Sequence, residues 1–306
     1  MPPQEHNYWL TTTNFPKTEP RPLPERVDVA VIGAGFTGLS AARTLAKRGA
    51  KVAVLESETI GWGASSRNGG MVLTGMKLGV NQLISMYGRE RTQRMYAASL
   101  ATIDCVEQII HDESIDCDFS RCGHLEVACK QKHFDDYARQ AEVIAREFHH
   151  TLRVVQKNEL SGEIGSTIYY GGMVDEVSAG ANPARYVAGL GRAAMRAGAE
   201  VFEHTTVESL QRGSNQGDAG WKVTTSHGEL WAREVFVGTS GYTSGATPAL
   251  QKKLIPIGSF IITTEVLPEA LAREVSPRNR MIYDSKNYLY YYRLTPDRRM
   301  LFGGRA

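Results

Sequence analysis

The fold is decided by the stretch Val27-Asp28-Val29-Ala30-Val31-Ile32-Gly33-Ala34-Gly35-Phe36-Thr37-Gly38. Its apolar first half predicts a buried strand, and residues 39–48 that follow predict an amphipathic helix ending at Gly49. Between strand and helix, Gly33 allows a tight turn, Gly35 allows a pyrophosphate to approach the backbone, and Gly38 lets the helix lie close to the sheet. The pattern therefore predicts a dinucleotide site with phosphates at the helix N-terminus.

A second predicted strand supports this interpretation. Residues 51–55 are mostly apolar and end at Glu56, which lies eighteen residues after Gly38. An acid in this place can accept hydrogen bonds from the ribose hydroxyls of an adenosine, and it disfavours a 2′-phosphate.

A second glycine-rich segment follows at residues 60–71, with the sequence IGWGASSRNGGM. An NAD-binding domain would normally continue with more of the nucleotide fold after Glu56, whereas here a turn of small and polar residues follows almost at once. This second segment resembles that of the FAD-dependent D-amino acid oxidase superfamily, the glycine, sarcosine and related amine oxidases. Within the superfamily it is most similar to gamma-glutamylputrescine oxidase and its relatives. The resemblance implies that this segment passes beside the pyrophosphate and the flavin ring.

The resemblance extends along nearly the whole chain. Asn7–Leu10 is similar to the N-terminal arm of the family, residues 181–203 to the segment that leads to a third flavin-domain strand, and residues 234–241 to a return strand and turn on the adenosine side. The glycine pattern and the resemblance together mark as FAD contacts Gly33, Gly35, Phe36, Thr37, Gly38, Glu56, Ser65, Ser66, Arg67, Asn68, Gly69, Gly70, Met71, Val207 and Thr239. Some relatives attach flavin covalently through a histidine of the second glycine turn. Because no histidine occurs between His6 and His111, we expect FAD to be bound non-covalently.

Composition limits the classes of function. With 306 residues, 42% of them hydrophobic, the chain can bury a sizeable core in more than one domain. A net charge of +2 gives no support for nucleic-acid binding, and no apolar segment reaches the roughly 18 residues of a membrane span. The proline-rich first 26 residues lack the apolar core of a signal peptide, which favours a cytoplasmic protein.

The four cysteines indicate ordinary reduced thiols. Their spacings include no Cys-x-x-Cys pair, and we expect no metal site and no disulfide.

The predicted fold class is α/β, with a Rossmann-like FAD-binding domain interleaved with an α+β substrate domain built on a mostly antiparallel sheet. Within it we expect long helices at 89–113 and 131–149, a strand at 123–128, a hairpin loop at 213–217, and strands at 257–265 and 288–293. The expected segments are an extended arm (1–26), two FAD-binding pieces (27–75 and 181–250), a helical and substrate-domain insertion (76–180) and an incomplete substrate sheet (251–306).

The last of these strands is rich in tyrosine. As a strand it would place Tyr288, Tyr290 and Tyr292 on one face, with Arg293 on the other. One face could line a pocket whose hydroxyls hold a substrate amine or carboxylate, and Arg293 could bind a carboxylate. A core strand with half-exposed tyrosines is an equally valid interpretation, and Asp284 is a weaker candidate. No general base can be assigned.

The resemblance implies oxidation of a small-molecule amine or amino acid. Hydride would pass to flavin N5, the imine would hydrolyse, and oxygen would reoxidise the flavin with release of hydrogen peroxide. An electron carrier could replace oxygen in a dehydrogenase. The family's sequences continue beyond the point that matches residues 301–306, so we expect a C-terminally truncated fragment. A flavin-binding module without turnover therefore stays open as the alternative.

Overall fold

The computed structural model describes residues 5–215 and 217–304. The chain divides into two compact units, each built from three separate segments. Unit 1 comprises the segment that ends at Asn68, the short segment Glu113–Cys117, and Pro183–Ile257. Unit 2 comprises Gly69–Asp112, Asp118–Asn182 and the segment that begins at Gly258.

Unit 1 is built on a six-stranded sheet in the order β8-β2-β1-β11-β10-β9. Its strands are β1 (Arg26–Ile32), β2 (Val52–Leu55), β8 (Glu200–Phe202), β9 (Val207–Asn215), β10 (Asp218–Thr225) and β11 (Gly228–Val237). The four strands β8, β2, β1 and β11 run parallel, and β10 and β9 are antiparallel additions. The predicted strands at 27–32 and 51–55 are confirmed. The hairpin predicted at 213–217 is confirmed too, although its strands extend further into the loop and residue 216 lies outside the described residues.

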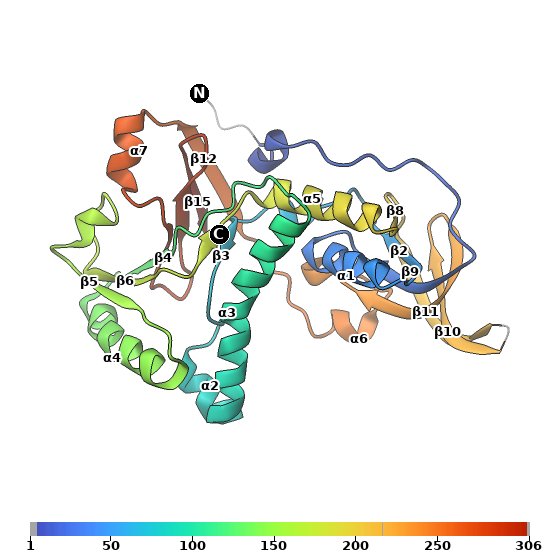
Figure 1. The fold of residues 1–306 in the computed structure, drawn as a ribbon, viewed down its shortest axis with the longest axis horizontal. Coiled ribbons are helices and arrows are strands. Elements are labelled where there is room, and N and C mark those ends of the chain that lie inside the picture. Colours follow the sequence, from blue (N-terminus) through green and yellow to red (C-terminus); the bar gives the residue numbers. More distant parts are fainter. Residues whose placement is uncertain (1–4, 216, 305–306) are drawn as a thin grey trace. The chain divides into compact units, whose positions relative to one another are not determined.

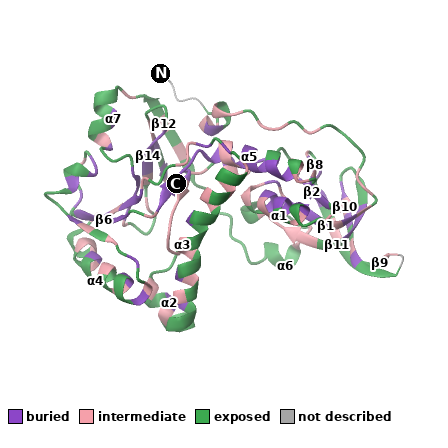
Figure 2. Cartoon of the chain, viewed as in Figure 1, coloured by how far each residue is buried: buried purple, intermediate pink, exposed green. Residues whose placement is uncertain are grey.

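Two helices of unit 1 pack against each other. They are α1 (Phe36–Lys47) and α5 (Pro183–Arg196), which Figure 1 shows beside the strands of this unit. The predicted stop of α1 is confirmed, because Gly49 follows the helix with a φ of +86°. Figure 2 shows how much of α5 and of the central strands is buried, and four successive residues at the end of β1 are buried, as expected for a strand covered on both faces. The shorter elements are η1 (Tyr8–Thr12), η2 (Ala64–Ser66), η4 (Ser240–Tyr242) and α6 (Pro248–Gln251).

Three glycines meet where β1, α1 and β11 converge. A Cβ atom on Gly38 would lie 1.9 Å from the carbonyl oxygen of Gly33, and a Cβ on Gly33 would lie 2.9 Å from the carbonyl oxygen of Gly238. Gly33 also has a φ of +99°, which favours glycine. Only residues without a side chain allow α1 to begin so close to the ends of the two strands.

A buried carboxylate connects the two helices. Glu113 is 6% exposed at its side chain, and its Oε1 accepts hydrogen bonds from Arg43 Nε at 2.6 Å and from Lys47 Nζ. Its Oε2 accepts from Arg196 Nη2 of α5 at 2.9 Å. Burial alone would raise the pKa of this carboxyl, but the three cations outweigh burial and lower its pKa to about 2.

Unit 2 is built on a seven-stranded sheet in the order β12-β15-β14-β13-β4-β6-β5. Its strands are β4 (His124–Val127), β5 (Arg153–Gln156), β6 (Gly171–Asp175), β12 (Phe260–Val266), β13 (Met281–Asp284), β14 (Tyr291–Leu294) and β15 (Arg299–Gly304). Neighbours are antiparallel except for β13 and β4, which are parallel. The mostly antiparallel second sheet is as predicted. A separate pair joins β3 (Met71–Val72) to β7 (Ala179–Gly180).

The helices of unit 2 include the two long ones that the sequence predicts. They are α2 (Val80–Tyr87), α3 (Arg89–Asp112), α4 (Gln131–Phe148) and α7 (Glu269–Val275), with η3 (Leu160–Gly162) as a short turn. The two long helices predicted at 89–113 and 131–149 correspond to α3 and α4. Within the described residues, no helix combines the length and the apolar character needed to cross a membrane.

The prediction of a strand at 288–293 is wrong for its first half. The strand β14 begins only at Tyr291, and the preceding residues form a bend. The cause is Asp284, whose Oδ1 accepts the backbone N–H groups of Lys286 at 3.2 Å and Tyr290 at 3.1 Å. This carboxylate folds the chain back on itself, and Tyr288 lies in the bend. Tyr290 and Tyr292 both pack against the ring of Phe302, with ring centroids 5.3 and 5.9 Å away.

The ion pairs of Glu113 predict a specific pH dependence. The pKa of this carboxyl is lower in the folded chain than in the unfolded one, so it stabilises the fold above about pH 4.5 and loses that effect as the pH falls toward 2. We expect Glu113→Gln to lower the free energy of unfolding by about 2 kcal/mol at pH 7, with the difference from wild type shrinking below pH 4.5. Urea unfolding between pH 7 and 3 measures this, and Glu90→Gln on exposed α3 is the control. A difference that does not change with pH would contradict this role.

The glycine contact predicts a steric effect. We expect Gly38→Ala to lower the stability of the ligand-free chain by about 2 kcal/mol, because its Cβ has to displace the Gly33 carbonyl. Gly241→Ala is the matched control, since a Cβ there meets nothing within 4 Å. Thermal unfolding followed by circular dichroism compares the two. Equal midpoints for both variants would show that the contact is not a constraint.

Candidate functional site

The first glycine-rich turn lies beside a carboxylate. Glu56 follows β2 directly, and its Oε2 accepts the backbone N–H of Ala34, within the turn, at 2.7 Å. Its Oε1 accepts the N–H of Glu58 at 3.0 Å. The parallel pairing of β1 with β2 brings the two carboxyl ends to one edge of the sheet, which is where open α/β sheets bind ligands.

The N-terminus of α1 has no side-chain cap, because its N-cap residue is Gly35. Phe36 N–H donates to Ser65 Oγ at 2.9 Å, and a Cβ on Gly35 would lie 2.8 Å from the same oxygen. The structure therefore brings Ser65 of the second glycine-rich segment onto the first turn of the helix. Thr37 and Gly38 complete this turn of α1.

The second glycine-rich segment is not a plain loop. Its residues Ala64–Ser66 form the 3-10 helix η2, and the side-chain amide of Asn68 donates back to Ala64 O at 3.0 Å. Arg67 is exposed, donates through Nε to Trp62 O at 2.6 Å and places its guanidinium 4.6 Å from the centre of the Trp62 ring.

The N-terminal arm contacts the same segment. Asn7 Nδ2 donates to Ser66 O at 2.9 Å, and Trp9 Nε1 donates to Asn68 O at 2.8 Å. Trp9 is only 2% exposed. Sequence reasoning recognised this arm but not its contacts, because no local pattern links residues about sixty positions apart.

The end of the segment belongs to unit 2. Gly70 O accepts a hydrogen bond from Arg293 Nη1 at 3.0 Å, and the same nitrogen donates to Ala181 O at 3.0 Å. The ring of Tyr291 covers Gly69, where a Cβ would lie 2.9 Å from the ring. Met71 pairs with Gly180 in the two-stranded sheet.

The remaining predicted cofactor residues lie at the ends of unit 1 strands. Val207 begins β9 and is buried, and Thr239 follows β11, where its hydroxyl is 2.7 Å from that of Thr243.

The four predicted substrate residues do not form one group. Tyr288 and Tyr290 are exposed by 69% and 40%, whereas Tyr292 is buried and donates to the hydroxyl of Tyr169 at 2.8 Å. Arg293 is 4% exposed, with its donors directed at backbone carbonyls.

Unit 2 also holds a buried polar cluster that the sequence did not reveal. His124 Nδ1 lies 2.8 Å from Ser178 Oγ and its Nε2 lies 3.2 Å from the Tyr283 hydroxyl, while His150 Nε2 lies 2.9 Å from Asp175 Oδ2. Burial lowers the pKa of His124 to about 4, so this imidazole is neutral near pH 7. Burial opposes ionisation of Asp175, but hydrogen bonds from His150 and Thr74 lower its pKa to about 2. These residues are single polar positions far apart in sequence, with no spacing that marks them.

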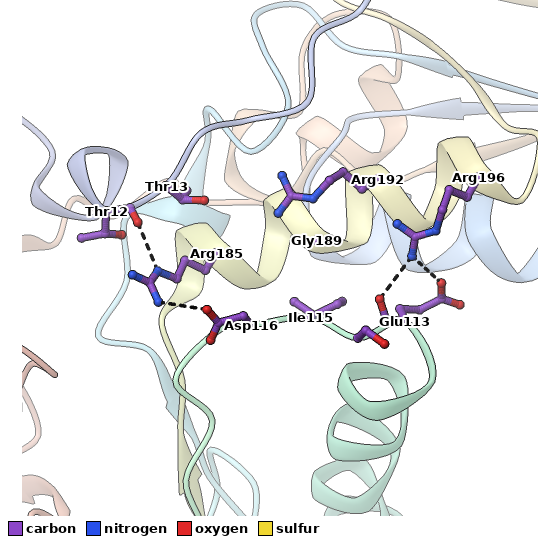
Figure 3. A pocket seen from close by; sticks show the side chains of 10 residues that line it. Thr12, Thr13, Glu113, Ile115, Asp116, Arg185, Gly189, Arg192 and Arg196 are labelled. Carbon is purple, nitrogen blue, oxygen red and sulfur yellow. Dashed lines mark hydrogen bonds and ion pairs between the residues drawn. The ribbon is translucent and has the colours of Figure 1, made fainter.

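A polar cavity of about 330 Å³ lies elsewhere on unit 1, along α5. Figure 3 shows Arg185, Arg192 and Arg196 along the helix, with Arg185 directed toward Thr12 and Asp116 and Arg196 toward Glu113. None of the predicted cofactor or substrate residues lines it.

The geometry of the two glycine-rich segments fits a flavin dinucleotide. The glycines leave the helix N-terminus without side chains, the Glu56 carboxylate lies at the adjoining turn, and Ser65 connects the two segments. A helix N-terminus binds phosphates, and a neighbouring acid binds a ribose.

Three comparisons with known proteins agree. The family model of FAD dependent oxidoreductases, DAO, matches residues 28–306. The chain is 33% identical to the probable oxidoreductase OrdL of Haemophilus influenzae over 98% of its own length and 70% of the relative. It is 33% identical to gamma-glutamylputrescine oxidoreductase of Escherichia coli over 90% of its length and 64% of the relative. The chain thus spans about two thirds of the length of these relatives.

Solved structures show the same fold at lower identity. Glycine oxidase from Geobacillus kaustophilus superposes with a TM-score of 0.69 at 21% identity, covering 92% of this chain and 71% of that one. L-amino acid deaminase from Proteus vulgaris gives a TM-score of 0.71 at 17% identity, covering 95% and 64%. The chain therefore shares its α/β fold with these two structures. With most of its length matched by the family model, the chain belongs to the DAO family of FAD dependent oxidoreductases.

Proposed function

We propose that this protein binds FAD non-covalently along its two glycine-rich segments and oxidises a carbon–nitrogen bond of an amine or amino acid. The observation that carries the proposal is the meeting of the first glycine turn, Glu56 and Ser65 at the N-terminus of α1, whose N-cap residue is Gly35. The absence of any histidine between His6 and His111 supports non-covalent attachment.

Each part of this arrangement has a proposed task. The amides at the start of α1 hold the pyrophosphate, and the glycines at 33, 35 and 38 let it approach. Glu56 exchanges its hydrogen bond with Ala34 for the ribose hydroxyls. Residues 65–71 line the pyrophosphate and flavin, and Val207 and Thr239 adjoin the adenosine.

Bound FAD would supply the redox chemistry: a hydride acceptor at flavin N5 for the substrate carbon and reoxidation by oxygen to give peroxide, while the imine product would be hydrolysed by water. The chain contributes orientation of the substrate and exclusion of water. The alternative is a dehydrogenase, in which an electron carrier and not oxygen reoxidises the flavin.

For the substrate we propose different roles for the four tyrosine-strand candidates. The side chains of Tyr288 and Tyr290 are exposed, and we assign their hydroxyls to contacts with a substrate amine or carboxylate. Tyr292 and Arg293 are buried and already bonded to Tyr169 and to backbone carbonyls, and we assign them to support of the sheet and of Gly70. The names of the relatives, gamma-glutamylputrescine oxidoreductase and glycine oxidase, favour an amine or amino-acid substrate.

We also propose a cytoplasmic location. Its support is the free state of the four cysteines, because disulfides are rare in cytosolic proteins.

The first experiment tests FAD binding and substrate oxidation in one sample. The purified chain is mixed with FAD, freed of excess by gel filtration, and its visible spectrum is followed during anaerobic addition of amines headed by gamma-glutamylputrescine. We expect a yellow protein whose flavin band bleaches with one amine, and we expect acid precipitation to release the flavin into solution. Admission of air should restore the band and produce peroxide.

Each outcome has a distinct meaning. A chain that retains no flavin would overturn the proposal. Retained flavin that no amine bleaches would favour a binding module without turnover, and recovery only with a carrier such as a quinone would favour a dehydrogenase.

The role of Glu56 gives a second prediction. We expect Glu56→Gln to weaken FAD binding by about tenfold, because a charged acceptor for the ribose hydroxyls contributes roughly 1.5 to 3 kcal/mol. Glu58→Gln, at an exposed neighbouring acid, is the control and should bind as wild type does. Quenching of FAD fluorescence measures both dissociation constants. Equal affinities would remove Glu56 from the site.

A further inference from the structure

The described part of the N-terminal arm, from residue 5 onward, is fastened to the rest of unit 1 at several points. Thr12 O accepts from Arg185 Nε at 3.1 Å, and Asn14 O accepts from Arg192 Nη1 at 3.1 Å, both arginines belonging to α5. Figure 3 shows the first of these contacts at the end of the polar cavity. Further along, Thr18 Oγ1 donates to Glu203 Oε2 at 2.5 Å, so the arm is bound to the helix and then to the end of β8.

Residues 7–12 of the arm have a defined conformation of their own. Asn7 is the N-cap of η1, and its Oδ1 accepts the N–H of Trp9 at 3.1 Å. The same side chain uses its Nδ2 to donate to Ser66 O at 2.9 Å and to Ser66 Oγ at 3.3 Å. One asparagine therefore both fixes the arm and contacts the second glycine-rich segment.

Trp9 makes the second contact from a buried position. Its indole is 2% exposed, and Nε1 donates to Asn68 O at 2.8 Å. Such a buried donor loses its partner only at the cost of an unsatisfied polar group. The bond therefore holds the Asn68 carbonyl in one direction.

A fixed carbonyl also fixes the following amide. The peptide unit is planar and trans, so its C=O and N–H point in opposite directions. When Ser66 O points to Asn7 and Asn68 O points to Trp9, the N–H groups of Arg67 and Gly69 point away from the arm. Arg67 N–H uses this direction to donate to Ala64 O at 3.1 Å, which closes η2.

We propose that Asn7 and Trp9 are positioning residues for FAD, which hold the backbone of residues 66–69 in the conformation that binds the cofactor, with the Gly69 N–H turned away from the arm. This inference rests on the proposed FAD site. It assigns to the arm a task in cofactor binding through backbone geometry, with no contact between these two side chains and the reacting atoms.

The test uses two variants that change one donor each. Trp9→Phe keeps an aromatic ring but removes the bond to Asn68 O. Asn7→Ser keeps a good N-cap residue but cannot reach Ser66. Trp231→Phe is the matched control, because Trp231 is also a buried tryptophan of unit 1 and its Nε1 has no hydrogen-bond partner among the described residues.

The readouts separate positioning from stability. FAD dissociation constants come from fluorescence quenching, the visible circular dichroism of bound flavin reports its surroundings, and thermal unfolding of the FAD-free chain reports the fold. We expect Trp9→Phe and Asn7→Ser each to weaken FAD binding about three- to tenfold and to alter the flavin dichroism. Trp231→Phe should change neither.

Wild-type affinity in both arm variants, with wild-type FAD binding intact, would overturn the inference while leaving the proposed function in place. Weaker binding that only follows partial unfolding of the FAD-free variants would equally overturn it. A wild-type chain that binds no FAD would instead refute the proposed function itself.

Discussion

The contact between Gly38 and the carbonyl of Gly33 is the constraint on which unit 1 depends. The carbonyl oxygen of Gly238 in turn lies where a Cβ of Gly33 would be placed. The ends of β1 and β11 and the start of α1 therefore share a space that admits no side chain. This closeness places the first amides of α1 directly at the edge of the parallel sheet. Glu56, at the end of the neighbouring strand, then reaches the turn through Ala34. One steric requirement thus brings the helix terminus and the carboxylate together.

The second glycine-rich segment is held differently. Its shape comes from side chains far away in sequence: Asn7 and Trp9 bind the carbonyls of Ser66 and Asn68, and Arg293 binds that of Gly70. Glycine and serine alone leave a backbone many conformations, so these three donors supply the order that the segment lacks. The two segments meet through Ser65, whose hydroxyl accepts the N–H of Phe36.

Much of the fold could be predicted because its signals are local. A continuous apolar run marks β1, a glycine marks the end of α1, and amphipathic periodicity marks α3 and α4. The tyrosine run failed because alternation cannot reveal that Asp284 bonds two backbone amides and bends the chain before Tyr291. The cluster of His124, Ser178 and Asp175 could not be predicted from the sequence, because the pairing of β4 with β6 brings together residues some fifty positions apart.

By itself, the sequence determined the dinucleotide turn, its acid and the order of helices and strands, because glycine sterics and hydrophobic periodicity act over a few residues. Only the tertiary structure decided which side chains face one another. Arg293, which the sequence suggested as a ligand for a substrate carboxylate, donates to the carbonyls of Gly70 and Ala181. Tyr292 is buried, whereas Tyr288 is exposed. Those outcomes depend on strand pairing and burial between distant segments, which no local pattern encodes.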